Sequence, residues 1–226
     1  MRRPGRPVVG LRIGKKLPSS GPGFLTLERF MARNLYAGGA VSEPYRFEVV
    51  HRRGVDAVAI FPFFYGDGRR RSLKVLLKVG FRPGLYLRAR LPLPVPDRRV
   101  YTFMYEAVAG SLEPRDRGDA GVDRRARAEL FEETGLRPQS ARIVRLGAGF
   151  FPSHGQSTEK IHLRAFPVDP SSAGPPPGDG SINEGDSGTF SLEAGRILQL
   201  CRRGSIEDPK VEIGVSRLCR RLGYKI

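Results

Sequence analysis

Three glutamates near the middle of the chain, Glu129, Glu132 and Glu133, have the residue type and spacing that metal-dependent chemistry requires. Residues three and four positions apart lie on one face of a helix, so these carboxylates would stand side by side. Carboxylates that close repel one another at neutral pH, whereas hard divalent cations such as Mg²⁺ bind clustered carboxylate oxygens. The spacing therefore indicates a metal site or, equally, a solvent-exposed acidic helix end.

A strand, a polar loop and a helix must position these glutamates. Residues 101–110 (YTFMYEAVAG) have the pattern of a strand that ends at a glycine. Residues 122–134 have the apolar spacing of a helix, and Gly135 supplies a stop directly after them. On this prediction the helix carries all three glutamates and follows the loop that leaves the strand.

This strand–loop–helix segment resembles the Nudix box. The second half of that pattern is Arg-Glu-apolar-x-Glu-Glu-x-Gly-apolar, and residues 128–136 (AELFEETGL) match it except that Ala128 replaces the arginine. The first half is looser, because eight residues separate Gly110 from Asp119 and eight more precede Ala128. The box therefore looks degenerate, with its metal-binding half the better preserved.

The resemblance extends to the ADP-ribose pyrophosphatase-like branch of the Nudix hydrolases. Four further segments are similar to that branch in the same order along the chain, from about residue 50 to the end. They are residues 74–83 (KVLLKVGFRP), 105–114 (YEAVAGSLEP), 149–166 (GFFPSHGQSTEKIHLRAF) and 197–218 (ILQLCRRGSIEDPKVEIGVSRL).

The resemblance implies a fold and a domain organisation. The fold is α+β, an α/β/α sandwich with a mixed sheet and an N-terminal strand-rich extension. The strands include a predicted hairpin of residues 55–64 and 73–81, and two C-terminal helices are expected over 192–201 and 211–223. The division is a flexible basic tail (1–23), the extension (24–50), which implies a homodimer, and the Nudix hydrolase domain (51–226).

The resemblance also implies a metal site for Mg²⁺ or Mn²⁺. Its ligands would be the backbone carbonyl of Ala109 and the carboxylates of Glu129 and Glu133. Glu132 is the third matching carboxylate, and all three glutamates are catalytic candidates. Ala128 removes the arginine that orients the catalytic glutamate in the family, so reduced turnover is expected.

Further residues are implied by the later segments. A glutamate in the acidic loop of residues 171–188 often acts as general base in this branch, and Glu184 matches it better than Asp186. Arg82 and Glu159 match positions near the substrate. These three residues complete the predicted site.

The function implied is metal-dependent hydrolysis of the diphosphate linkage of a nucleoside diphosphate sugar, giving a nucleoside monophosphate and a sugar phosphate. ADP-ribose comes first because the branch favours it, and the base and the sugar stay open. Two alternatives remain. One is a Nudix-fold binding or regulatory module that holds a nucleotide without cleaving it, and the other is an RNA 5′-end pyrophosphohydrolase.

Composition bounds the partners. Lys and Arg number 39 against 23 Asp and Glu, a formal net charge of +16 that favours anions such as nucleotides, although an Arg-rich composition explains it equally well. A small-molecule nucleoside diphosphate is the expected partner, and nucleic acid, which is not expected, stays open as an alternative. No apolar run approaches the roughly 20 residues of a membrane span. The two cysteines, Cys201 and Cys219, predict reduced thiols and a cytoplasmic protein.

Overall fold

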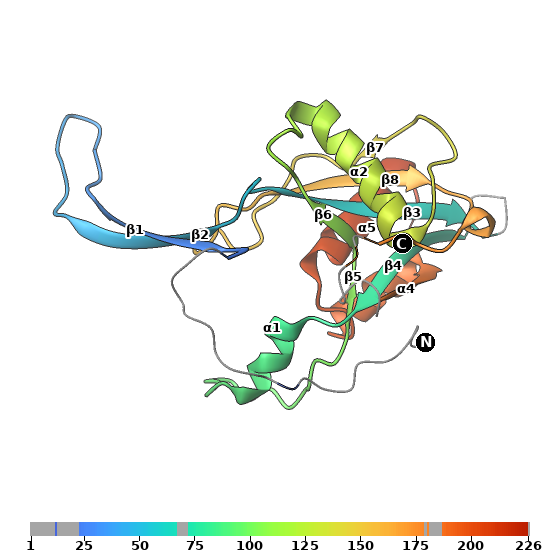
Figure 1. Ribbon diagram of the computed structural model, residues 1–226, viewed down its shortest axis with the longest axis horizontal. Coiled ribbons are helices and arrows are strands. Elements are labelled where there is room, and N and C mark those ends of the chain that lie inside the picture. Colours follow the sequence, from blue (N-terminus) through green and yellow to red (C-terminus); the bar gives the residue numbers. More distant parts are fainter. Residues whose placement is uncertain (1–11, 13–22, 67–71, 179, 181–186, 226) are drawn as a thin grey trace.

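The computed structural model describes residues 12, 23–66, 72–178, 180 and 187–225. Apart from Arg12 and Gly23, the predicted tail of residues 1–23 lies outside the described residues. Within them the chain is an α+β protein with a seven-stranded mixed sheet and a separate two-stranded sheet (Figure 1). The strands are β1 (Thr26–Ala32), β2 (Tyr45–His51), β3 (Ala57–Tyr65), β4 (Leu73–Gly80), β5 (Met104–Glu106), β6 (Val108–Ser111), β7 (Val144–Arg145), β8 (Ile161–Pro167) and β9 (Gly188–Glu193).

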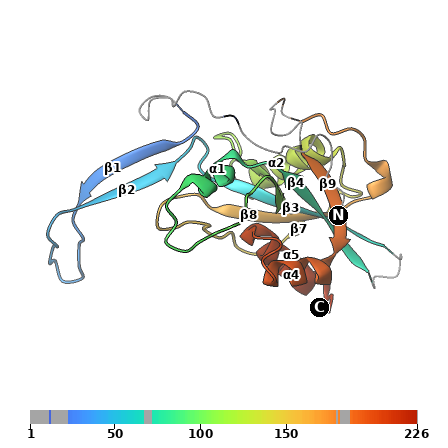
Figure 2. The same cartoon turned by 90° about the horizontal axis from the view of Figure 1, so that it is seen from below.

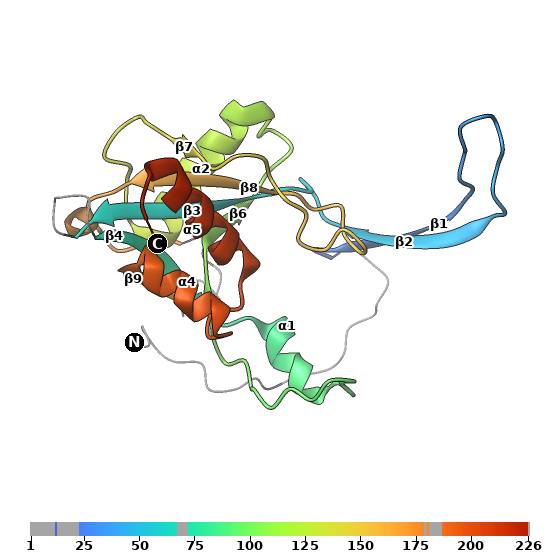
Figure 3. The ribbon, with the colours of Figure 1, turned by 180° about the vertical axis from the view of Figure 1, so that it is seen from behind.

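Helices cover both faces of the larger sheet (Figures 2 and 3). The helical segments are α1 (Pro83–Tyr86), η1 (Leu87–Arg90), α2 (Gly118–Thr134), η2 (Pro170–Ser172), α4 (Ala194–Arg202) and α5 (Pro209–Leu222). The helix α2 packs on one face, and α4 and α5 pack on the other. In the described part of the chain, no helix combines the length and the apolar character that crossing a membrane would require.

The central strand β3 explains why the sheet is mixed. It pairs antiparallel with β4 and β6 and parallel with β8. The order is β5–β4–β3–β8–β7, with β6 also beside β3 and β9 also beside β4. Phe63 pairs with Val75 between β3 and β4, which confirms the predicted hairpin.

Both faces of β3 are buried, and each face belongs to a different hydrophobic core. Ala59 and Phe61 pack in the core under α4 and α5, whereas Val58 and Ile60 pack in the core under α2. Alternate residues of a strand point to opposite faces, so a sheet covered on both sides requires an unbroken apolar run. This is why the sequence of β3 shows no polar alternation.

The helix α2 carries the glutamates and is longer than predicted. It begins at Gly118 rather than at residue 122. Asp119 lies in its first turn, where the helix dipole stabilises a negative side chain. It ends at Thr134, and Gly135 adopts a left-handed conformation with φ of 67°, as the predicted stop requires. Ala126 and Leu130 are buried in the core, which orients the rest of the helix.

Three other predictions differ from the structure. The strand expected over residues 101–110 is divided at Ala107, whose amide donates to Asp208 Oδ2 at 3.1 Å, so that β5 pairs with β4 and β6 with β3. The run ARIVRLGAGFF of residues 141–151 also has the pattern of a strand, but it forms only β7. The strand β9 was not predicted, because its residues fall between the end of the predicted loop of residues 171–188 and the start of the next predicted helix. It pairs with the edge of β4 opposite to β3.

The strands β1 and β2 form the separate two-stranded sheet, a hairpin that projects from the body of the molecule (Figure 1). This confirms the strands predicted in residues 24–50. The hairpin joins the body where the Val50 amide donates to the Gln156 carbonyl at 2.8 Å. Its apolar residues are largely exposed, because no other element of the described chain covers them.

Candidate functional site

The turn at Ala109 and Gly110 in β6 lies directly against Glu129 of α2. A Cβ atom built on Gly110 would lie 1.8 Å from Glu129 Cδ. Real atoms do not approach so closely, so only glycine allows the carboxylate to rest on this strand. The strand end and the helix face that the sequence predicted are therefore in contact.

Glu133 is buried one turn further along α2 and forms an ion pair with Lys78 of β4. Its other oxygen, Oε2, accepts a hydrogen bond from the Ala109 amide at 3.2 Å. Lys78 is itself only 5% exposed, in a strand whose one other charged residue, Lys74, is half-buried. A buried charge is tolerated only with a partner, so this pair fixes α2 against the sheet at the Ala109 turn.

A pocket of about 460 Å³ opens at this turn, and we call it the acidic pocket. Its charged lining residues come from both sides of the turn. They are the cations Lys78, Arg82 and Arg125 and the carboxylates Glu106, Glu113, Glu129, Glu132 and Glu133. Carboxylates thus outnumber cations by two in a chain whose net charge is +16.

Glu132 is the carboxylate that remains available in the acidic pocket. It is half-buried, and its side chain makes no hydrogen bond or ion pair within the described part of the chain. By contrast, Lys78 holds Glu133, and Arg125 Nη1 lies 3.7 Å from Glu129 Oε1. The three predicted glutamates therefore line one pocket, each in a different electrostatic environment.

The side chains do not form a ready metal centre. Among the residues that the structure describes, no three His, Cys, Asp or Glu side chains are grouped so that they could hold one ion. Their chemistry nevertheless fits a hard divalent cation, because the pocket offers carboxylate oxygens and a surplus of negative charge. Side-chain rotation of Glu129 and Glu132, which lie on the rim of one pocket, would be needed to bring them together.

Arg125 takes the place nearest to the missing box arginine. It contacts Glu129 from one helical turn earlier and donates from Nε to Asp116 Oδ2 at 3.0 Å. Burial lowers the pKa of Arg125, but its hydrogen bonds to Asp116 and Glu113 raise it by more, so it lies above the ordinary value. Arg127 points elsewhere and donates to the Ala141 carbonyl at 3.0 Å, as the helical geometry at position 128 predicts.

The first half of the box does not contribute to this pocket. Asp119, the shifted counterpart of the usual glutamate, is exposed and binds Arg145 at 2.9 Å and Arg164 at 2.8 Å. It does not line the acidic pocket.

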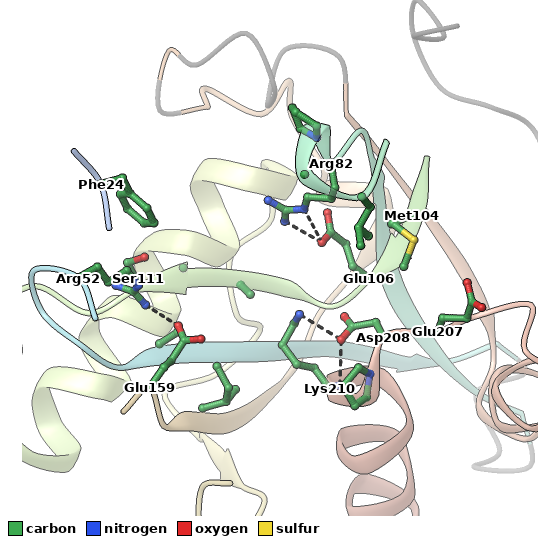
Figure 4. A pocket seen from close by; sticks show the side chains of 18 residues that line it. Phe24, Arg52, Arg82, Met104, Glu106, Ser111, Glu159, Glu207, Asp208 and Lys210 are labelled. Carbon is green, nitrogen blue, oxygen red and sulfur yellow. Dashed lines mark hydrogen bonds and ion pairs between the residues drawn. The ribbon is translucent and has the colours of Figure 1, made fainter. Parts of the chain in front are cut away.

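A second pocket of about 650 Å³ adjoins the first and shares the Ala109 and Gly110 turn with it. Both predicted substrate residues line this adjoining pocket, and Figure 4 shows their partners. Arg82 donates to Glu106 Oε2 at 2.9 and 2.7 Å, and Glu159 accepts from Arg52 at 2.8 Å. Burial lowers the pKa of Arg82, but the nearby Glu106 carboxylate raises it by more, so the guanidinium stays charged.

Arg52, in the wall of this adjoining pocket, has one buried hydrogen-bond donor without a partner among the described residues. Its Nη1 atom is buried and has no partner among the described residues, while Nη2 binds Asp56 and Glu159. The Phe24 ring lies over the guanidinium at 5.7 Å. A buried donor without a partner costs about 1–3 kcal/mol, which a ligand acceptor at this wall would offset. Met104, Leu85, Ile161 and other apolar residues line the same pocket.

One predicted site residue lies outside the described chain, and three residues of the site were not predicted. Glu184 and Asp186, the general-base candidates, lie outside the described residues. Sequence reasoning missed Lys78, Glu106 and Arg52 as members of the site. For Lys78 a signal existed, since it and Lys74 are the only charged residues in the largely apolar run LKVLLKVG.

The comparisons with known proteins do not assign the chain to a family. No protein-family model matches the sequence, and a search of curated proteins gives no significant match. The functional interpretation therefore depends on the site itself and on the resemblance of its motifs.

Proposed function

We propose that this protein is a Nudix-type hydrolase that cleaves the diphosphate linkage of a nucleoside diphosphate sugar, with Mg²⁺ or Mn²⁺ as cofactor. One observation carries the proposal, namely the surplus of carboxylates in the acidic pocket of a strongly basic chain. A pocket with this surplus attracts cations, and a divalent cation in turn attracts a diphosphate.

The backbone carbonyl of Ala109 and the carboxylates of Glu129 and Glu133 would hold the metal. Bound there, the ion would neutralise the diphosphate and polarise its phosphoryl oxygens. Glu132 makes no hydrogen bond or ion pair in the described chain, so its carboxylate can accept a proton from an attacking water. Glu184 stays the second candidate for that role.

Arg82 lines both pockets and therefore lies where a ligand would pass from one to the other. Its charge can stabilise negative charge that develops on the departing phosphate. Glu106 holds the guanidinium from behind through two hydrogen bonds. The nucleoside or the sugar would then occupy the adjoining pocket, where apolar walls and the Arg52 donor offer contacts.

A nucleotide-binding module that does not cleave is the second candidate function. It is favoured by the ion pair between Glu133 and Lys78, which occupies a predicted metal ligand, and by Ala128. The RNA 5′-end alternative lacks such support, because Lys78, Arg82 and Arg125 in the acidic pocket are each paired with a carboxylate. Among the described residues that line the acidic pocket, these pairs leave no unpaired cation beside the glutamates.

The test is phosphate release from a panel of nucleoside diphosphate sugars, including ADP-ribose, with Mg²⁺, with Mn²⁺ and with a chelator. We expect metal-dependent turnover in the wild type and its loss in Glu132→Gln, whose unpartnered side chain is not needed for folding. Glu212→Gln is the matched control, since Glu212 is exposed on α5 and lines neither pocket. Turnover that survives chelation would refute the metal dependence, and turnover that survives Glu132→Gln would refute the role of Glu132. Absence of turnover with every substrate of the panel would refute the hydrolase. Calorimetric binding without turnover would establish the second candidate.

The homodimer belongs to the same proposal. Phe30 and Phe47 stack at 5.1 Å on the projecting hairpin and are 43% and 41% exposed. Exposed apolar surface of this kind marks interaction sites. In a two-fold dimer, the same hairpin of a second copy would cover this surface. Light scattering should give twice the mass of one chain, and a monomer at working concentration would contradict this part of the proposal.

A further inference from the structure

An arginine pocket lies at the opposite end of α5 from the candidate active site. Its hollow has a volume of about 400 Å³, and its lining residues are Arg145, Leu146, Gly147, Arg217, Arg220 and Arg221. None of these residues lines the acidic or the adjoining pocket. Lys210, which lines the adjoining pocket, and Arg220 are separated along α5 by about 15 Å.

Among the residues that the structure describes, only one of the four arginines has carboxylate partners. Arg145 binds Asp119 at 2.9 Å and Asp123 at 2.8 Å. The same two aspartates also bind the buried Arg164, at 2.8 and 2.5 Å. The charges of the two aspartates are therefore balanced by those of Arg145 and Arg164. These aspartates do not neutralise the other arginines of the pocket.

The other three arginines come from the last turns of α5. Within the described chain, no carboxylate forms an ion pair with Arg217, Arg220 or Arg221. Arg217 donates to the carbonyls of Leu146, at 3.2 Å, and Ala148, which fixes its guanidinium against the loop after β7. The negative end of the helix dipole favours cations in this last turn, but only by about 0.3–1 kcal/mol at exposed positions. It does not neutralise three of them.

We propose that this arginine pocket binds phosphate groups of an anionic ligand, either a free nucleotide or polyphosphate or the backbone of a single-stranded RNA. Guanidinium groups present paired N–H donors that match phosphate oxygens. A phosphate chain carries several negative charges in a small volume, which suits three uncompensated cations around one hollow. The proposal is independent of the hydrolase activity, because no residue of the catalytic site takes part.

The test compares two double variants that remove the same charge. Arg220→Gln/Arg221→Gln removes two arginines from the pocket. Arg202→Gln/Arg203→Gln removes two exposed arginines from the end of α4, outside this pocket and both pockets of the candidate site. The full chain is titrated in chelator with inorganic pyrophosphate by calorimetry, and with a labelled single-stranded RNA by fluorescence anisotropy at several salt concentrations. Circular dichroism verifies folding, and Arg221→Gln alone replaces the first variant if its folding is impaired.

We expect the pocket variant to weaken binding by about tenfold or more and the control by less than about twofold. If RNA is the ligand, the slope of log K against log salt should also fall by about 1.4 for two lost phosphate contacts. Loss confined to pyrophosphate identifies a free phosphorylated ligand, and loss confined to RNA identifies a polynucleotide. Absence of binding by the wild type, equal loss in both variants, or no loss in either would overturn the proposal.

Discussion

Replacing Gly110 by alanine should separate the chemistry of the acidic pocket from the stability of the fold. The new Cβ would lie 1.8 Å from Cδ and Oε1 of Glu129 and 2.4 Å from its Cγ. Carbon atoms in contact stand about 3.5 Å apart, so the Glu129 carboxyl group must move by about 1.7 Å. Because these atoms are the end of a flexible side chain, the side chain moves and the backbone stays.

The expected consequences differ by orders of magnitude. Misplacing a catalytic group by 1 Å can reduce a rate by about 100-fold, so kcat of Gly110→Ala should fall by about 100-fold or more. The ion pair lost with Arg125 is an i,i+4 pair worth only about 0.3–0.5 kcal/mol. The free energy of unfolding should therefore change by less than about 1 kcal/mol, which for a chain of this size shifts Tm by less than about 4 °C.

The assay is the hydrolysis of nucleoside diphosphate sugars that the proposed function requires, with thermal unfolding measured on the same samples. Gly174→Ala is the matched control, because a Cβ there meets nothing within 4 Å. An unchanged kcat in Gly110→Ala would show that the Glu129 carboxylate has no role in turnover. A large fall in Tm would show that the backbone, rather than the side chain, takes up the clash.

Three further predictions concern neighbouring residues. Lys78→Met leaves the buried Glu133 carboxylate without its cation. It should reduce the free energy of unfolding, measured in urea titrations, by about 3–5 kcal/mol. The double variant Lys78→Met/Glu133→Leu should recover most of this loss. Ala128→Arg should leave turnover unchanged or raise it by up to about tenfold, the worth of one charge-assisted hydrogen bond, and a sharp fall in kcat would mean that the site uses another geometry. Burial raises the pKa of Asp116, but the hydrogen bonds from a backbone amide and two arginines lower it by more, below the ordinary value. The stability that Asp116 contributes is therefore present above its unfolded pKa and lost as pH falls through the folded one, so acid unfolding of Asp116→Asn should depend less steeply on pH.

The elements that local sequence determines could be predicted, and those that depend on distant pairing could not. The apolar runs of β3 and β4 and the Gly135 stop of α2 are properties of neighbouring residues, and the structure confirms them. By contrast, β9 is a short strand whose burial alternates, and it exists because β4 offers a free edge. Nothing within its own residues distinguishes it from the end of a loop.

The candidate site shows the same division. The spacing of Glu129, Glu132 and Glu133 predicted that they share one helix face, and all three line the acidic pocket. The partner of Glu133 could not be predicted, because Lys78 lies 55 positions away and is brought near by the sheet. A lysine within a mostly apolar strand indicates that a buried partner exists without indicating which carboxylate it is.

The charge of the whole chain and the charge of the acidic pocket act over different ranges. Exposed charges separated by more than about 8 Å are largely screened at physiological ionic strength. The net charge of +16 therefore raises the local concentration of anions near the surface but does not decide what enters the pocket. Inside, a bare diphosphate would meet two more carboxylates than cations and be repelled. The two charge distributions favour the same ligand only when a divalent cation accompanies the diphosphate, which is why the carboxylate surplus supports a metal-dependent reaction more strongly than the basic composition does.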